Sequence, residues 1–255
     1  MRVVKIGGRA QGDPSIIAAL HQAWSDSPNG VCIVHGGGDE VSSMQRALGR
    51  EAAFVGGRRV TSQDDLDLLR MVLSGVVNKR LVNALVAAGI SAVGLSGEDD
   101  ALIGAEVIDA ASLGLAGRPT AINVQLLRTL MDAGYVPVIS PVGYDTTSGK
   151  GGALNVNGDD AAAAIAVALK ADELLLIADV EGVRGTQGEV IQFLSIESAR
   201  DLIASGVAAG GMAAKLESAY AALLGGVDRV RICDLAGLAD SERGTFVTQS
   251  QGVVS

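Results

Sequence analysis

The first eight residues combine an apolar run, one lysine and two closing glycines. The β-branched valines and isoleucine of this run favour a buried strand, and Gly7 and Gly8 favour a tight loop at the end of that strand. A buried ammonium group without an anionic partner is costly. Lys5 therefore predicts a phosphate or carboxylate nearby, which the glycines would allow the backbone to approach. The alternative is an edge strand whose lysine points to solvent.

A second junction between a strand and a helix carries three glycines. The apolar run 31–34 leads into His35-Gly36-Gly37-Gly38, and a helical pattern resumes over residues 41–48. Backbone N–H groups at a helix N-terminus favour anions through their unpaired donors and through the helix dipole. A tight turn alone would need only one glycine. We therefore interpret Gly37 and Gly38 as part of an anion-binding loop.

Strand-like and helical segments alternate along the rest of the chain, with glycine-bearing turns between them. This alternation is typical of an α/β fold. We expect a three-layer αβα sandwich with an open, mainly parallel central sheet. The segment 101–120 interrupts the alternation with short β-like pieces and predicts a hairpin excursion. The helices are expected at residues 62–88, 123–133, 161–169 and 216–224, and the further strands at 91–95, 136–140, 173–178, 229–233 and 244–248.

Composition narrows the classes of function. The chain has 255 residues, of which 48% are hydrophobic, so it can bury a substantial core. A net charge of -9 and an aromatic content of 3% argue against nucleic acid and against an anionic membrane surface as partners. No apolar run approaches the roughly 18 residues of a membrane span, and no leader pattern precedes the first strand. Cys32 and Cys233 lie among valine and isoleucine and suggest neither a disulfide nor a zinc site. We expect a cytoplasmic protein that binds a small molecule.

Polar residues at further junctions are candidates for ligand binding. Arg58 and Arg59 follow a Gly-Gly turn; they could form an exposed basic corner, or one of them could grip a carboxylate with its planar fork. Asn155 and Asn157 alternate in an extended segment, as ligand-facing amides would. Asp159 stands at the start of the next helix, where it could be only a cap.

The last candidates follow the same logic in the second half of the chain. Asp179 comes after the apolar run 173–178, at the strand end where open α/β sheets bind ligands. Lys215 lies beside the glycine-rich helix start at residues 210–211. Two lysines, glycine loops and an aspartate are suited to neutralising a phosphoryl group in transfer. The pattern therefore indicates phosphoryl transfer without a Walker loop.

Eight short motifs together resemble the amino acid kinase family, and within it the enzymes that phosphorylate N-acetyl-L-glutamate. They occur in the family order over nearly the whole chain. The motifs are Lys5-Ile6-Gly7-Gly8, His35-Gly36-Gly37-Gly38, Arg59-Val60-Thr61, Val77-Asn78-Lys79, Ala92-Val93-Gly94-Leu95, Asn155-Val156-Asn157-Gly158-Asp159, Asp179-Val180-Glu181-Gly182-Val183 and Gly211-Met212-Ala213-Ala214-Lys215.

The resemblance implies a role for each matching residue. Lys5 and Lys215 would stabilise the transferring phosphoryl group from two sides, and Asp159 would hold both lysines in place. Gly8, Gly37 and Gly38 would supply backbone N–H donors. Arg59 and Asn155 would bind the α-carboxylate and acetamido groups of the substrate. The nucleotide would contact Lys5, Gly7, Gly8, Asp179, Gly182, Met212 and Lys215.

The implied reaction is the ATP-dependent phosphorylation of the side-chain carboxylate of N-acetyl-L-glutamate, a step of arginine biosynthesis. Mg²⁺ would be held by the ATP phosphates, with no protein metal site. A single domain would comprise a substrate-binding and dimerisation lobe, residues 1–150, and a nucleotide-binding lobe, residues 151–255. Three alternatives stay open: N-succinylglutamate as substrate, an aminoadipate or glutamate bound to a carrier protein, and a catalytically silent sensor.

The sequence also departs from the family pattern in ways that bear on assembly and regulation. Phe54-Val55-Gly56-Gly57-Arg58-Arg59 differs from the commoner Asn-Gly-Leu-Arg form. Gly158 stands where the family usually has alanine, and the segment 234–244 is short. Because no helix precedes the first strand in this sequence, the resemblance implies a homodimer that is insensitive to arginine, paired through the first lobe and the helix 62–88.

Overall fold

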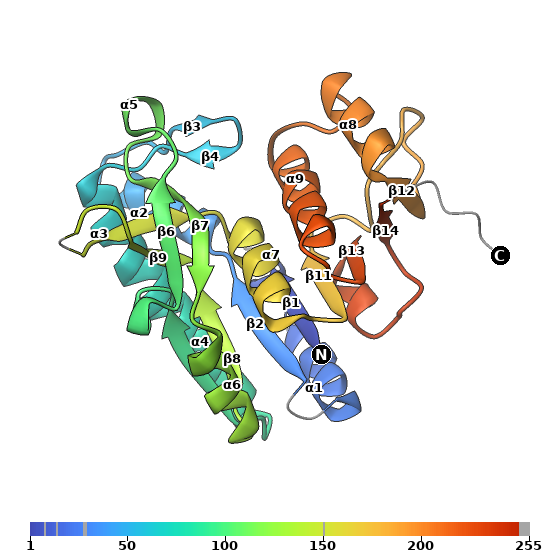
Figure 1. The fold of residues 1–255 in the computed structure, drawn as a ribbon, viewed down its shortest axis with the longest axis horizontal. Helices are drawn as coiled ribbons and strands as arrows, with labels where there is room; N and C mark the ends of the chain where they lie inside the picture. The colour runs from blue at the N-terminus through green and yellow to red at the C-terminus, as the bar shows by residue number, and fades with distance from the viewer. Residues whose placement is uncertain (8, 14, 28–29, 150, 250–255) are drawn as a thin grey trace.

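The computed structural model describes residues 1–7, 9–13, 15–27, 30–149 and 151–249. An eight-stranded sheet runs through its centre, in the order β12-β14-β13-β11-β1-β2-β8-β5 (Figure 1). Neighbouring strands pair in parallel except β13 and β14, which are antiparallel. The sheet consists of β1 (Arg2–Ile6), β2 (Val31–His35), β5 (Ala92–Ser96), β8 (Val136–Ser140), β11 (Glu173–Ile177), β12 (Phe193–Ser195), β13 (Arg229–Cys233) and β14 (Thr245–Thr248).

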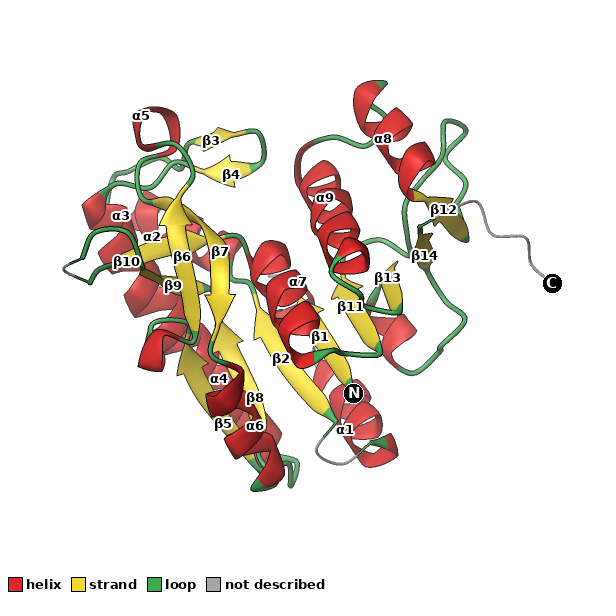
Figure 2. Ribbon diagram, viewed as in Figure 1, coloured by secondary structure: helices red, strands yellow, loops and turns green. Residues whose placement is uncertain are grey.

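Helices cover both faces of this sheet, so the expected three-layer α/β fold is confirmed (Figure 2). One apolar core joins the sheet to α6 (Val124–Asp132), α7 (Gly158–Leu169), α8 (Ile196–Ala204) and α9 (Gly210–Leu224). A second core joins the opposite face to α1 (Ile16–Asp26), α4 (Asn78–Ala87) and η4 (Leu235–Leu238). In β1, Val3 belongs to the first core and Val4 to the second. Because side chains alternate along a strand, Lys5 points to the α7 and α9 face.

Two small β structures flank the sheet. Strands β6 (Ile103–Val107) and β7 (Ala116–Ile122) are antiparallel, as the predicted hairpin excursion requires, and they close a four-stranded barrel with β9 (Val142–Asp145) and β10 (Ala153–Val156). This closure was not predicted from the sequence. A separate hairpin pairs β3 (Phe54–Val55) with β4 (Arg58–Arg59). Its turn residues Gly56 and Gly57 have φ of 55° and 76°, the left-handed conformation that favours glycine.

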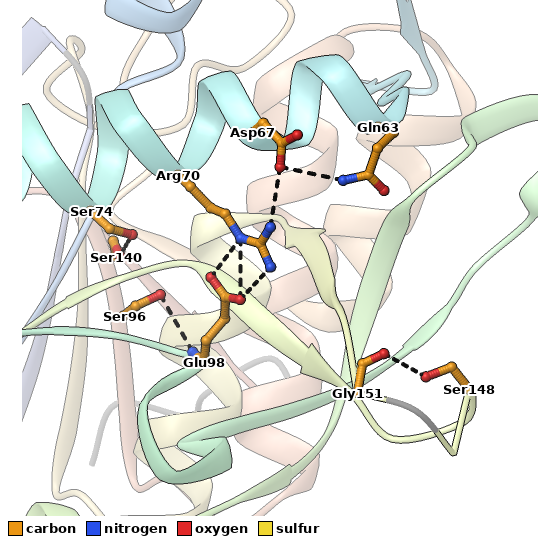
Figure 3. A network of polar contacts seen from close by, with 9 residues as sticks. All are labelled: Gln63, Asp67, Arg70, Ser74, Ser96, Glu98, Ser140, Ser148 and Gly151. Atoms are coloured by element: carbon orange, nitrogen blue, oxygen red, sulfur yellow. Dashed lines mark hydrogen bonds and ion pairs between the residues drawn. The ribbon is translucent and has the colours of Figure 1, made fainter.

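The helix expected over residues 62–88 is present as a continuous helical stretch: α3 (Gln63–Leu69), the π-type segment η2 (Arg70–Val77) and α4. Ser62 caps its start in a capping box with Asp65. Figure 3 shows how Arg70 ties the stretch to the edge of the sheet: its guanidinium donates to Glu98 at 2.7 Å and to Asp67 at 3.2 Å. The remaining elements are η1 (Arg9–Gly12), α2 (Gly38–Ala47), η3 (Asp99–Ala101) and α5 (Ala110–Leu113).

Two sequence expectations about the chain as a whole can be compared with the structure. Cys32 and Cys233 are both buried and free, so no disulfide joins them. In the part of the chain that the structure describes, no helix is both long and apolar enough to cross a membrane. The division into two lobes at residue 150 stays a prediction, because β1 pairs with β2 on one side and β11 on the other and makes the sheet continuous.

Candidate active site

Two lysines and one aspartate meet between the sheet and its helices. The Nζ atoms of Lys5 and Lys215 lie 3.0 Å and 2.9 Å from the same atom, Oδ1 of Asp159. All three residues are buried. Lys5 comes from β1, Asp159 from the first turn of α7 and Lys215 from α9. Residues separated by more than 200 positions in the sequence therefore form one cluster, with two positive charges around one negative charge.

The capping of α7 falls to Asn157, which leaves Asp159 available for the lysines. The Asn157 side chain accepts from the backbone N–H of Asp159 at 2.8 Å and of Asp160 at 3.4 Å. An asparagine at this position satisfies the unpaired donors of the first helical turn. From the sequence, Asp159 was a possible cap and Asn157 a ligand-facing amide, but Asn157 has the capping role in the structure.

Burial and the neighbouring charges shift the pKa values of Asp159 and Lys215. Burial alone would raise the pKa of Asp159, but the ammonium groups of Lys5 and Lys215 and their hydrogen bonds hold it well below its usual range. Burial lowers the pKa of Lys215, and so does the charge of Lys5, while Asp159 and Asp179 oppose that shift. The carboxylate stays ionised at neutral pH. The cluster then carries one unit of positive charge more than negative charge, which favours an incoming anion.

The glycine loop after β2 lies against the long helical stretch. Gly37 has a φ of 144°, and a Cβ atom there would lie 2.6 Å from Cδ2 of Leu73, so only glycine fits without a shift. The Gly36 N–H donates to the carbonyl of Ile6 at 2.9 Å, which joins this loop to the end of β1. Gly38 opens α2. The loop thus brings a helix N-terminus to the carboxyl ends of β1 and β2, a position that favours anions.

His35 supports the glycine loop. It is fully buried, its Nδ1 lies 2.7 Å from the carbonyl oxygen of Gly36, and its Nε2 lies 3.1 Å from the amide nitrogen of Asn78. Donation by Nδ1 to that carbonyl and acceptance by Nε2 define one neutral tautomer. Burial, together with the charges of Lys79, Arg80 and Lys5, lowers the pKa of His35 to about 4, although its hydrogen bond to Gly36 opposes this shift. These contacts make His35 a support of the backbone around the glycine loop.

A cavity of about 140 Å³ opens beside the lysine cluster. Its lining includes the glycine loop, Arg59, Asn155 and the α7 start at Asn157 and Gly158. Gly158 forms part of the cavity wall. A Cβ atom on Gly158 would lie only 3.2 Å from Cε of Lys5, so the Lys5 side chain packs directly against this part of the wall. The cavity is therefore placed to bring a small substrate next to Lys5.

Arg59 is held by neutral acceptors at the wall of this cavity. Its guanidinium donates to Gln45 Oε1 at 2.5 Å, to Ser42 Oγ at 2.8 Å and to the Gly38 carbonyl at 2.9 Å. It also lies 4.8 Å from the centre of the Phe54 ring. Burial lowers the pKa of Arg59, an effect that the charges of Asp65 and Asp39 oppose. A buried guanidinium bound mainly by uncharged groups retains its attraction for a carboxylate.

Of the other predicted site residues that the structure describes, one lines the same cavity as Arg59 and the rest lie elsewhere. Asn155 lines the cavity and donates to Thr61 Oγ1 at 2.9 Å. Asp179 lines a separate opening next to η1 and η4 at the ends of β1, β11 and β13. Met212 is half-buried in the first turn of α9. A Cβ atom on Gly7 would lie 3.1 Å from the Ile177 carbonyl, and one on Gly182 would lie 2.6 Å from Thr245 Oγ1. Gly8 lies outside the described residues.

The sequence model of the amino acid kinase family matches residues 1–234. The chain belongs to this family. Acetylglutamate kinase from Cereibacter sphaeroides is 44% identical over 238 residues, which are 91% of this chain and 79% of the relative. The crystal structure of smu.665 from Streptococcus mutans UA159 has a TM-score of 0.89 and 31% identity, with 98% of each chain covered. N-acetylglutamate synthase from Neisseria gonorrhoeae, solved with coenzyme A and N-acetyl-glutamate, has a TM-score of 0.83 and 26% identity, over 98% of this chain and 60% of the synthase.

Membership of the amino acid kinase family confirms the resemblance drawn from the eight motifs. The structure also shows residues outside the motifs: Gln45 and Ser42 hold Arg59 from α2. Asn78 does belong to a motif, and the structure shows its contacts with His35 and, at 2.9 Å, with the Val138 carbonyl. Such partners give no local sequence signal, because their roles depend on contacts between segments far apart in the chain.

Proposed function

We propose that this chain transfers the γ-phosphoryl group of ATP to the side-chain carboxylate of N-acetyl-L-glutamate, giving an acyl phosphate and ADP. The observation that carries the proposal is the buried pair of lysines around Asp159, next to a small cavity that contains a buried arginine. The name and the identity of the Cereibacter sphaeroides relative support the same substrate.

The positive charges and backbone N–H donors of the site would stabilise the charge on the phosphoryl group during its transfer. Lys5 and Lys215 are proposed to contact the γ-phosphoryl oxygens, where charge increases during transfer, and Asp159 to hold both ammonium groups in place. The N–H groups of Gly37 and Gly38, and of Gly8, are proposed to add hydrogen bonds. The attacking carboxylate is already ionised at neutral pH, since its pKa is about 4, so the reaction needs no general base.

The substrate is proposed to occupy the cavity beside Gly158. Arg59 would bind the α-carboxylate in two-point fashion, and Asn155 would bind the acetamido group. A small cavity and a fixed guanidinium would place the side-chain carboxylate toward Lys5. Positioning of this kind accounts for a large part of catalysis when there is little covalent chemistry for the protein to perform.

ATP is proposed to enter as its magnesium complex and to lie on the α9 side of the site. Gly7, Asp179, Gly182 and Met212 would then border the nucleotide. Mg²⁺ would come with the phosphates as part of the substrate, and among the residues that the structure describes no group of three histidine, cysteine or acidic side chains is placed to hold a metal.

We also propose a cytoplasmic homodimer. The helical stretch over residues 63–87 exposes several large apolar side chains: Met71 is 61% exposed, Val76 55% and Val86 54%. An isologous contact between two copies of this stretch would cover them. Light scattering tests the assembly, and a monomer at micromolar concentration would contradict it.

The reaction is tested by a coupled assay of ADP release with MgATP and free N-acetyl-L-glutamate, with hydroxylamine added to trap the acyl phosphate. We expect turnover and a hydroxamate product. N-succinylglutamate serves as the comparison substrate. Turnover of N-succinylglutamate alone, or of neither free compound, would contradict the proposal.

A further inference from the structure

The two adjacent arginines of strand β4 point to opposite sides of the hairpin. Arg59 reaches α2, as described above, whereas Arg58 reaches α7, where its NH1 lies 2.5 Å from Oδ2 of Asp160. This division follows from the alternation of side chains along a strand. The hairpin is therefore fixed to the first half of the chain by one arginine and to the second half by the other. Arg58 also lines the substrate cavity.

Asp160 has a second partner on α9. Ser218 Oγ lies 2.6 Å from Oδ1 of Asp160, and Ser218 is only 2% exposed. Ser218 follows Lys215 by one helical turn, and Asp160 follows Asp159 directly. The two carboxylates thus make parallel connections between the same two helices. Asp159 holds the lysines, and Asp160 joins α9 to the hairpin through Arg58.

The hairpin needs such connections to keep its position. Its strands are two residues long and form a sheet of their own. Isolated two-stranded hairpins are marginally stable in water. The tip lies against the start of α9, since a Cβ atom on Gly57 would lie 3.1 Å from the Gly210 carbonyl. The close approach of the Gly57 and Gly210 backbones places the hairpin tip beside α9. The ion pair of Arg58 with Asp160 adds a directional hydrogen bond.

We propose that Arg58, Asp160 and Ser218 form a hairpin latch, which fixes β3 and β4 over the substrate cavity and makes Arg58 and Asp160 positioning residues for the acceptor substrate. The inference rests on the proposed function in that N-acetyl-L-glutamate is the acceptor. With the latch intact, Arg59 on the same strand is held in register with α7 and with Lys5. With the latch broken, the hairpin samples more conformations, so the acceptor binds more weakly, while the nucleotide side is left unchanged.

The first test is a double-mutant cycle with Arg58→Ala and Asp160→Asn. We expect each single change to raise the KM for N-acetyl-L-glutamate about tenfold or more, with the KM for ATP within about twofold of the wild type. The double variant should be no worse than the worse single variant, because both changes break one contact. Arg58→Lys should recover part of the loss. Arg118→Ala is the matched control, since Arg118 borders the neighbouring groove and pairs with Glu106.

The cycle also separates the latch from direct binding. If Arg58 contacts the substrate itself, Arg58→Ala will raise the KM and Asp160→Asn will not, which would overturn the proposal. Additive effects in the double variant would overturn it as well. If neither single change alters the KM, the latch does not position the acceptor.

The second test measures the hairpin without turnover. The Val60 N–H donates to the Ala53 carbonyl at 2.9 Å at the base of the hairpin. We expect hydrogen exchange of this segment to speed up at least tenfold in Arg58→Ala and Asp160→Asn, and to be unaltered in Arg118→Ala. Unchanged exchange in the first two variants would overturn the latch. Because this readout needs no substrate, it distinguishes failure of the latch from failure of the proposed function.

Discussion

Replacing Asp159 with asparagine removes the negative charge between two buried lysines and keeps the size of the side chain. The two Nζ atoms lie 3.0 and 2.9 Å from one oxygen, so they are at most 5.9 Å apart. At an effective dielectric constant of about 20, each attraction to the carboxylate is about 5–6 kcal/mol, and the repulsion between the lysines is at least about 3 kcal/mol. Desolvation offsets much of this, and breaking a buried ion pair costs about 3–5 kcal/mol in practice.

We expect Asp159→Asn to lower the free energy of unfolding by about 3–5 kcal/mol. Its kcat should fall about 100- to 1000-fold, the loss of about 2.7–4 kcal/mol that follows removal of a transition-state donor, because the lysines are no longer held in their positions. The measurements are urea unfolding by circular dichroism and the coupled assay of ADP release. Asp132→Asn, which removes an exposed carboxylate on α6, is the control.

The dependence on pH gives an independent check of the same reasoning. The pKa of Asp159 is held below its ordinary value by the lysines. Its contribution to stability is therefore fully present above the unfolded pKa of about 4 and is lost only as the pH falls below that value. The stability difference between wild type and Asp159→Asn should stay constant from pH 8 to pH 5. The electrostatic account as a whole would be refuted by an Asp159→Asn variant whose free energy of unfolding is within about 1 kcal/mol, and whose kcat is within about threefold, of the wild-type values.

Three further predictions concern the remaining site residues. Lys5→Ala and Lys215→Ala should each lower kcat about 100- to 1000-fold and change both Michaelis constants much less, and a pure KM effect in steady-state kinetics would contradict their role. Arg59→Ala should raise the KM for N-acetyl-L-glutamate by about 10- to 100-fold, from the loss of a charged hydrogen bond of about 1.5–3 kcal/mol, and weakening of ATP binding alone would show that Arg59 lies on the nucleotide side. The pKa of His35 is about 4 in the folded protein and about 6.5 in the unfolded chain. As the pH falls from 7.5 to 5, the unfolded chain takes up a proton, so the wild type should lose about 2 kcal/mol of its free energy of unfolding. His35→Gln should lose less, and equal losses for the two proteins in urea unfolding would contradict this prediction.

The sequence was most informative where local patterns coincide with the site. Lys5 in an apolar strand before two glycines was correctly interpreted as a buried lysine in need of an anion, and the glycine run after β2 was correctly placed between a strand and a helix. These predictions succeed because strand alternation and glycine conformation are properties of short segments.

The rest could not be predicted because it depends on pairing across long separations. Arg58 and Asp160 are 102 positions apart, and neither residue carries a local sign of the other. The sequence offered Asp159 as the possible cap of α7, whereas Asn157 takes this role in the structure. The Asp159 carboxylate is held instead by Lys5 and Lys215, which are distant in the sequence. The closure of β6, β7, β9 and β10 into a barrel likewise depends on a parallel pair between β6 and β9.

The central position of β1 has a consequence for the order in which the chain can fold. Arg2 is paired with Glu173, 171 positions later, and the lysine cluster is complete only when residue 215 is present. During synthesis, β1 can pair with β2 early, but its other edge has no partner until β11 has been made. Long-range parallel pairs of this kind slow folding, because the entropy of closing the loop is lost before the contacts form. The two lysines that are proposed to share one phosphoryl group therefore come together only near the end of synthesis.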